Sequence, residues 1–182
     1  FKKIKNFLFK IYKIKCYELK TLKLKKLINI KVNYNQIGSD RLANAISAIN
    51  NKDNFIILDF GTATTFDVVL KNKYKGGIIA PGVNLSLKTL VEKAKLIPNT
   101  KLTKIKNIIG KNTQNAVRSG FYWGYQGLIE NMINLIEKKY KKNFKIIFTG
   151  GLSHLFKDTI KKKIKIDRDL TIKGLLRLVD SI

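Results

Sequence analysis

The chain has 182 residues, of which 45% are hydrophobic, and a formal net charge of +25. This hydrophobic content suffices for a packed core, and no apolar run reaches the length of a membrane-spanning helix. Cys16 is the single cysteine, which excludes an internal disulfide and a cysteine metal cluster and fits a reducing, cytoplasmic setting. The length is that of one ordinary domain or of two small lobes.

Lysine carries almost all of the positive charge. Of the 37 basic residues, the arginines are Arg41, Arg118, Arg168 and Arg177. Proteins that read nucleic acid rely on arginine for bidentate contacts, and the lysines here are dispersed along the chain. We therefore expect a solvated lysine-rich surface and no specific nucleic-acid binding. A basic nucleic-acid-binding protein stays as an alternative, which a steep fall of affinity with salt would reveal.

The first quarter of the chain contains three predicted elements. Residues 1–10 form an amphipathic helix by their apolar spacing, and Tyr12, Ile14 and Cys16 alternate with lysines as in a half-solvated strand. The stretch 21–35 is ambiguous and is compatible with another short strand. Residues 39–50 read as a helix that begins near Ser39 or Asp40.

The remainder interleaves strands and helices, which predicts an α/β fold. The expected strands are 55–59, 66–70, 77–80 and 144–148, with the first two close enough to form a hairpin. The expected helices are 84–95, 112–140, one after Gly151, and 169–181. Gly120, Gly124 and Gly127 fall in the longest helix, where each weakens it by about 1 kcal/mol relative to alanine. They indicate close approach by another backbone or a ligand.

A polar cluster follows directly on a buried strand in ILDFGTATTFDVV, residues 57–69. Asp59 at the strand end, followed by glycine and hydroxyl residues, is typical of a turn whose N–H groups face an anion while the carboxylate holds a cation. The alternative is a hairpin turn that satisfies its own hydrogen bonds. Asp67, later in the same stretch, has no predicted role, and a turn of its strand toward solvent would account for it.

Two further segments suggest binding or catalysis. In the segment Gly38–Asn44, Asp40 is placed to act as a general base, with Arg41 to grip an anionic group; the alternative is a helix cap and a salt bridge. In the segment Phe148–Gly151, two glycines after a strand allow close approach by a nucleotide, although such turns are frequent.

Two other residues, Thr113 and His154, have smaller predicted roles. Thr113 closes a Gly-Lys-Asn-Thr segment that lacks the leading glycine of a phosphate-binding P-loop, because Lys106 stands there, and is an N-cap or a substrate contact. His154, the sole histidine, is expected at the surface or at a helix start.

The motifs IGSDRLANAISA, FIILDFGTATTFDVV, YKGGIIAPGVN, IGKNTQNAVRSGF and FTGGL follow one another in this order. From about residue 28 to the C-terminus, the chain resembles the type III pantothenate kinases. The resemblance implies ATP-dependent phosphorylation of pantothenate, the first step of coenzyme A synthesis. It also implies the mixed-sheet, ribonuclease-H-like fold that the family shares with sugar kinases, heat-shock ATPases and actin. A homodimer with pantothenate near the subunit interface, a monovalent cation (K⁺ or NH₄⁺) and Mg²⁺ with ATP are implied as well.

The resemblance assigns roles to individual residues. Asp40 matches the general base, and Asp59 matches the aspartate that binds the monovalent cation. The substrate-binding residues implied are Gly38, Ser39, Asp40, Arg41 and Thr113, with alanine more usual where Ser39 stands. The ATP-binding residues implied are Thr62, Gly150 and Gly151, with Thr149 beside them.

One departure from the family concerns the start of the chain. Family members begin with a strand and an Asp-x-Gly-Asn-Thr phosphate loop, which nothing in residues 1–37 matches. We therefore expect residues 1–36 to be the remnant of an N-terminal half that is largely missing, and residues 37–182 to be the catalytic half. The piece alone should bind ATP poorly and expose apolar surface. The alternative function is that of a non-catalytic relative acting as a regulatory or transcription-accessory protein.

Overall fold

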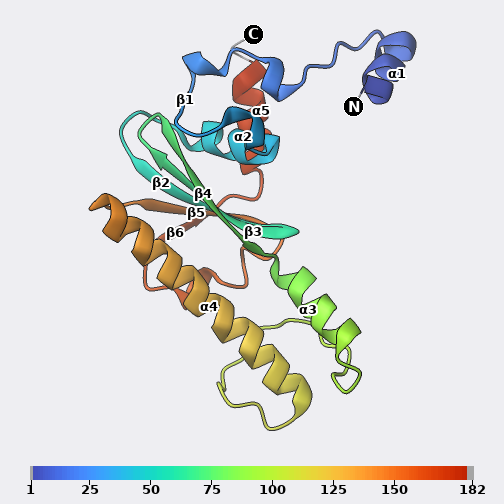
Figure 1. The fold of residues 1–182 in the computed structure, drawn as a ribbon, viewed down its shortest axis with the longest axis vertical. Coiled ribbons are helices and arrows are strands. Elements are labelled where there is room, and N and C mark those ends of the chain that lie inside the picture. Colours follow the sequence, from blue (N-terminus) through green and yellow to red (C-terminus); the bar gives the residue numbers. More distant parts are fainter. Residues whose placement is uncertain (1, 180–182) are drawn as a thin grey trace.

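A six-stranded mixed sheet forms the centre of the molecule in the computed structural model, which describes residues 2–179 (Figure 1). The strands are β1 Asn29–Ile30, β2 Asn54–Phe60, β3 Ala63–Leu70, β4 Lys73–Pro81, β5 Lys145–Gly150 and β6 Ile164–Ile166. Their order in the sheet is β1-β4-β3-β2-β5-β6. Strands β2, β3 and β4 form an antiparallel meander, β5 adds parallel to β2, and β6 and β1 add parallel at the two edges. The predicted α/β class and the predicted hairpin are confirmed.

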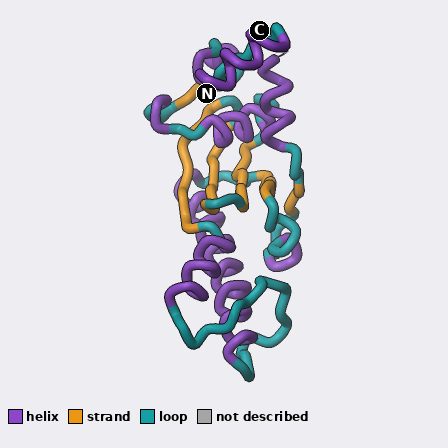
Figure 2. Tube along the Cα trace, turned by 90° about the vertical axis from the view of Figure 1, so that its right-hand side faces the viewer, coloured by secondary structure: helices purple, strands orange, loops and turns teal. Residues whose placement is uncertain are grey.

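Helices cover both faces of the sheet, as Figures 1 and 2 show. The helices are α1 Lys2–Tyr12, α2 Ser39–Ala48, α3 Val83–Lys93, α4 Thr113–Tyr140 and α5 Leu170–Val179. Short 3-10 turns occur at Leu19–Thr21, Leu24–Lys26, Tyr34–Gln36 and Lys157–Thr159. The pair α2 and α5 lies on one face, and α4 lies on the other with α3 extending beyond the sheet (Figure 1). The molecule therefore has three layers.

Two clusters of apolar side chains, one on each face, form the core. Ile57 of β2 packs toward α2 and α5, whereas its neighbours Ile56 and Leu58 pack toward α4, because side chains alternate along a strand. Helix α4 contributes Ile129 and Ile133, four residues apart and both fully buried, to the second cluster. Each such side chain stabilises the fold by roughly 1.5–3 kcal/mol.

Helix α5 holds α2 in place over the sheet. Gly174 of α5 lies against the backbone of α2, since a Cβ added there would come within 1.9 Å of the carbonyl oxygen of Ala43. Arg177 Nη1 donates to the carbonyl oxygens of Ile46 and Ile49 at 2.9 and 2.5 Å, which satisfies main-chain acceptors at the C-terminal end of α2. Helix α5 thus holds the C-terminal end of α2 in position.

Several local predictions are wrong. Residues 12–16 form no strand: α1 extends to Tyr12, Lys13 has a φ of +56°, and Ile14 is half exposed. The helix expected after Gly151 is a run of turns, and strand β6 was not predicted. The last helix covers Leu170–Val179, and the predicted residues 180 and 181 lie outside the described residues. Helix α1 matches the prediction but buries none of its residues.

Within residues 2–179 of this chain, nothing approaches the α4 glycines closely, and approach by a ligand or a second copy stays a prediction. A Cβ added to Gly120, Gly124 or Gly127 would meet nothing within 4 Å, and all three positions are exposed. The half of α4 that carries them extends beyond the sheet (Figure 1). These glycines leave an open helix face.

Candidate functional site

The first turn of α2 presents two charged side chains next to the sheet. Gly38 is the N-cap of this helix, and a Cβ added there would come within 2.4 Å of Asp40 Oδ1, so glycine leaves room for that carboxylate. Asp40 is exposed, and its Oδ1 accepts a hydrogen bond from the backbone N–H of Arg41 at 2.8 Å. Ser39 beside it is exposed too. Asp40 thus lies at the positive end of the helix dipole, where acidic residues are favoured.

Asp59, at the end of β2, is held by hydrogen bonds that run from two helices. Asn44 Nδ2 donates to Asp59 Oδ2 at 3.1 Å, and Thr171 Oγ1 of α5 donates to Asn44 Oδ1 at 2.6 Å. Asn44 is fully buried on α2. The sequence pattern predicts no role for Asn44 or Thr171. The one available signal was that Asn44 follows Asp40 by four residues, which puts both on one helix face.

The surroundings of Asp59 suit a bound cation. Burial raises the pKa of its carboxyl, the hydrogen bond from Asn44 opposes that rise, and the negative charge of Asp40 adds to it. A carboxylate destabilised in this way gains from a positive ion beside it. Thr65, which faces Asp59 across the β2–β3 pair, has a buried hydroxyl oxygen without a hydrogen-bond partner in residues 2–179. Oxygen donors of this kind are the ligands that hard cations take.

Three glycine turns surround the same end of the sheet. Gly150, at the end of β5, has a φ of +84°, and a Cβ added there would come within 2.6 Å of Asp59 Oδ1. Gly82, after β4, lies against the turn after β2, since its Cβ would come within 2.0 Å of the carbonyl oxygen of Thr62. Thr62 and Gly151 are exposed, and Gly151 has open space around it. The segments predicted from sequence as nucleotide contacts therefore meet at one place.

Asp67 does not face solvent, so that part of the sequence interpretation is wrong. It is fully buried on β3, directly opposite Ile57 of β2, which puts it on the face that α2 covers. Its Oδ1 accepts hydrogen bonds from Arg41 Nε at 2.9 Å and from the Tyr74 hydroxyl at 2.5 Å. Burial raises the pKa of Asp67, and these two donors oppose the rise. Arg41 is therefore tied to the sheet beneath α2.

Thr113 lies apart from the other predicted residues. It is the first residue of α4. Tyr125, later in the same helix, donates its hydroxyl to the carbonyl oxygen of Pro81 at 3.2 Å, near the glycine turns. Twelve residues of helix separate Thr113 from Tyr125, a distance of about 18 Å along the axis. Figure 1 shows this end of α4 on the far side of the sheet from α2. One copy of the chain does not bring Thr113 to Asp40.

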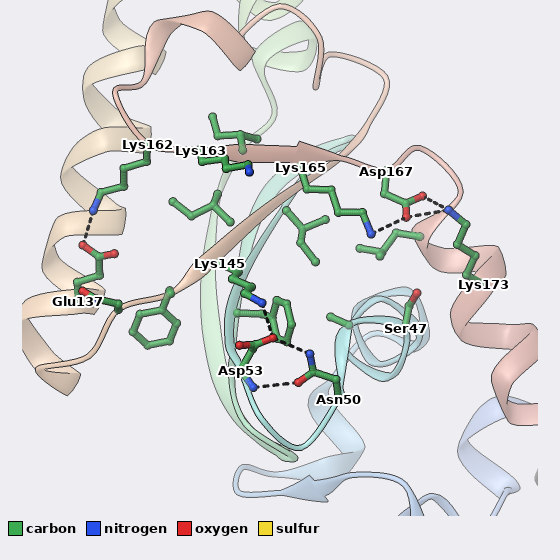
Figure 3. A pocket seen from close by; sticks show the side chains of 18 of the residues that line it. Ser47, Asn50, Asp53, Glu137, Lys145, Lys162, Lys163, Lys165, Asp167 and Lys173 are labelled. Carbon is green, nitrogen blue, oxygen red and sulfur yellow. Dashed lines mark hydrogen bonds and ion pairs between the residues drawn. The ribbon is translucent and has the colours of Figure 1, made fainter.

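A groove of about 1090 Å³ lies elsewhere, between α5 and the β5–β6 edge (Figure 3). None of the predicted site residues lines it. Four of its five lysines are paired with carboxylates: Lys145 with Asp53, Lys162 with Glu137, and Lys165 and Lys173 with Asp167. Because the motif residues lie elsewhere, we do not assign the chemistry to this groove.

Two smaller expectations can be compared with the structure. His154 is exposed, as predicted, and its Nδ1 lies 3.4 Å from Arg168 Nη2. Over residues 2–179, no three histidine, cysteine, aspartate or glutamate side chains gather into a metal site. None of the helices in this range has both the length and the apolar character needed to cross a bilayer.

Comparison with known proteins gives consistent matches. A family model described as type III pantothenate kinase matches residues 1–135. A type III pantothenate kinase of Pelagibacter ubique is 66% identical over 177 residues, which are 97% of this chain and 71% of that protein. Those of Paramagnetospirillum magneticum and a Sulfurihydrogenibium species are 42% and 41% identical over 79% and 81% of this chain. The chain spans 56% and 61% of the length of these two relatives.

Solved structures with a similar fold were also found. The crystal structure of a Baf family transcriptional activator from Campylobacter jejuni has a TM-score of 0.61 and 22% identity, over 92% of this chain and 80% of that one. The Alp12 filament structure has a TM-score of 0.52 and 16% identity, over 78% and 51%. At these identities the likeness shows the fold alone.

Proposed function

Because the chain belongs to the type III pantothenate kinase family, we propose that its complete gene product phosphorylates pantothenate with ATP, in coenzyme A biosynthesis. The observation that carries this proposal is the meeting of the α2 first turn, Asp59 and three glycine turns at one end of the sheet. Phosphoryl transfer asks a protein mainly for positioning and for neutralisation of charge, and these groups supply both. The proposed setting is the cytoplasm.

Asp40 is the proposed general base. It is exposed at the helix start, where a substrate hydroxyl can approach it, and its carboxylate is held by the Arg41 N–H. Taking the proton of that hydroxyl makes its oxygen a better nucleophile toward the γ-phosphate of ATP. Arg41, the neighbouring residue, grips the anionic end of the substrate, and Gly38 and Ser39 complete the binding segment.

Asp59 is the proposed ligand of a monovalent cation, K⁺ or NH₄⁺, and Mg²⁺ is proposed to arrive with ATP. The raised pKa of Asp59 and the unpartnered hydroxyl of Thr65 support a cation at this place. A cation there would neutralise phosphate charge beside the glycine turns. Thr62, Gly150 and Gly151 are the proposed contacts to ATP, since backbone without side chains permits close approach of phosphate and adenosine groups.

A homodimer accounts for the position of Thr113. We propose that Thr113 contacts the substrate bound to a second copy of the chain, because in its own copy it lies apart from Asp40. The open glycine face of α4 is available for such a contact. We further propose residues 37–182 as the catalytic half and residues 1–36 as part of an N-terminal half, although β1 within that segment pairs with β4.

The decisive test is pantothenate phosphorylation by the complete gene product, with and without K⁺, beside the variant Asp40→Asn. We expect K⁺-dependent turnover that falls at least about 100-fold in the variant, as removal of a general base requires. The matched control is Asp53→Asn, at the opposite end of β2, where the carboxylate pairs with Lys145 at 2.5 Å. A wild-type protein without activity would favour a non-catalytic relative. Full activity in Asp40→Asn would assign the base to another residue.

A further inference from the structure

We propose that Asp67 is a positioning residue, which acts through Arg41 to hold its guanidinium toward the anionic end of the substrate. This inference rests on the proposed function and adds to it a residue outside the segments that the family resemblance assigned. Asp67 and Arg41 are 26 residues apart in the chain and belong to β3 and α2.

The position of Asp67 is costly for a carboxylate. Its side chain is fully buried within an apolar face, beside Ile57 and two residues before the fully buried Val69. A buried charge destabilises a fold unless it is paired and hydrogen-bonded, and an apolar residue of similar size is often at least as stable. Stability alone therefore does not explain an aspartate here, whereas the control of a neighbouring charge does.

The contacts of Arg41 show what Asp67 controls. Arg41 Nε and Nη2 lie 2.9 and 2.7 Å from the same atom, Asp67 Oδ1. One edge of the guanidinium is thereby fixed, and the edge that ends in Nη1 is left for another anion. The side chain of Arg41 is 13% exposed, so the group is neither free in solvent nor closed off.

Two further residues, Tyr74 and Gly77, surround the Arg41 guanidinium. Tyr74 donates its hydroxyl to Asp67 Oδ1 at 2.5 Å and so restrains the oxygen that Arg41 contacts. Gly77 of β4 stands opposite Asp67, and a Cβ added there would come within 2.5 Å of Arg41 Nη2. The guanidinium therefore lies between Asp67 and the β4 backbone at Gly77. A lysine has a single ammonium group, which could not make these two contacts to Asp67 in the same orientation.

The arrangement separates two adjacent roles. Asp40 is exposed, while Arg41, one residue later, is anchored to Asp67 of the sheet. If Arg41 were unanchored, its long side chain would sample several rotamers, and substrate binding would have to order it. Asp67 removes most of that cost before the substrate arrives.

The test compares Asp67→Asn with the control Asp53→Asn in the complete gene product, measuring kcat, the KM for pantothenate and the KM for ATP. Loss of one charge-assisted contact should raise the KM for pantothenate about 10- to 100-fold. The KM for ATP should stay within about twofold, because the ATP contacts lie at the glycine turns. Pantothenate binding measured by calorimetry without ATP should weaken by the same factor as the KM. An unchanged KM for pantothenate in an active enzyme would overturn the proposal, and so would an equal loss in both KM values.

A double-mutant cycle separates positioning from general stabilisation. In an Arg41→Lys background, Asp67→Asn should add less than about threefold to the KM for pantothenate, because Asp67 then has no guanidinium to orient. Additive effects would overturn the proposal. Should Asp67→Asn fail to fold, Tyr74→Phe serves instead: it removes only the hydroxyl that restrains Oδ1 and should still raise the KM for pantothenate, and no change would count against us. A wild-type protein that does not phosphorylate pantothenate would refute the proposed function itself.

Discussion

Alanine at position 150 should harm both the fold and the cation site, whereas alanine at the next position should leave the fold intact. Gly150 has a φ of +84°, and a Cβ there would come within 2.6 Å of Asp59 Oδ1 and 2.7 Å of the Phe60 nitrogen. Gly151 has no positive φ, and its added Cβ would meet nothing within 4 Å. Two adjacent glycines of one motif thus give opposite expectations for the same substitution.

The two costs of Gly150→Ala can be added. A side chain in the left-handed region costs about 1–2 kcal/mol, and forcing a methyl group into packed surroundings costs about 1–3 kcal/mol. The sum is about 2–5 kcal/mol of unfolding free energy. For a domain of this size, each kcal/mol lowers Tm by about 2–4 °C, so Tm should fall by about 10 °C. Gly151→Ala should stay within about 0.5 kcal/mol of the parent.

Thermal unfolding of the parent and both variants, followed by K⁺ titration of kinase activity, checks this reasoning. Because the new methyl group would displace the Asp59 carboxylate, Gly150→Ala should also require more K⁺ for half-maximal activity. For Gly151→Ala we expect an altered KM for ATP without a change in Tm, as a nucleotide contact implies. Equal Tm shifts in the two variants, or a shift below about 2 °C for Gly150→Ala, would show that the strand end relaxes and that our geometric argument fails.

Two further predictions concern Asp59 and the α4 glycines. Since burial raises the pKa of Asp59 in the folded protein, its charge opposes folding at neutral pH, and that cost disappears as the pH falls through the raised pKa. In K⁺-free buffer, Asp59→Asn should therefore raise Tm by a few degrees at pH ~7 and by less at pH ~4, and a lower Tm at pH ~7 would contradict this. In a separate K⁺ titration of kinase activity, the same variant should show no activation by K⁺. Because the proposed homodimer would use the open glycine face of α4, Gly124→Ala should dissociate the dimer in sedimentation analysis. A dimer that stays intact while α4 gains about 1 kcal/mol would show that no second copy packs there.

The regular elements of the sheet were predictable because local pattern and tertiary position agree. Runs such as Phe55–Leu58 combine β-branched and aromatic residues with a hairpin spacing, and the observed β2–β3 pair follows from them. The α2 helix, predicted to begin near Ser39 or Asp40, followed equally from local signals, although its N-cap is Gly38. Where the alternation of apolar and polar residues was the sole signal, it gave a wrong prediction. Tyr12, Ile14 and Cys16 alternate as in a strand, but no strand among residues 2–179 pairs with them, and an unpaired strand has no partner for its backbone.

The prediction of a helix after Gly151 was wrong for a related reason. Phe156 is fully buried and packs with ring centroids 5.5 Å from Phe60 and 5.9 Å from Tyr122, and Ser153 and Ile160 of the same segment are buried too. An aromatic side chain packed in this way holds the segment against β2 and α4, so the segment does not need the repeating apolar face of a helix. Strand β6 is three residues long, and only its pairing with β5 defines it.

The residues that the sequence could not reveal are those whose role lies in a partner distant along the chain. Asp67 needs Arg41, 26 residues earlier, and Asn44 needs both Asp59 and Thr171, the latter 127 residues later. A buried aspartate looks in sequence like an interruption of a strand, and its charge reads as a signal for solvent. Only the β2–β3 register, which puts Asp67 opposite the buried Ile57, reverses that interpretation. The motif residues would thus identify a family, whereas the contacts that hold them in working positions become visible only when the sheet register and the α2–α5 packing are known.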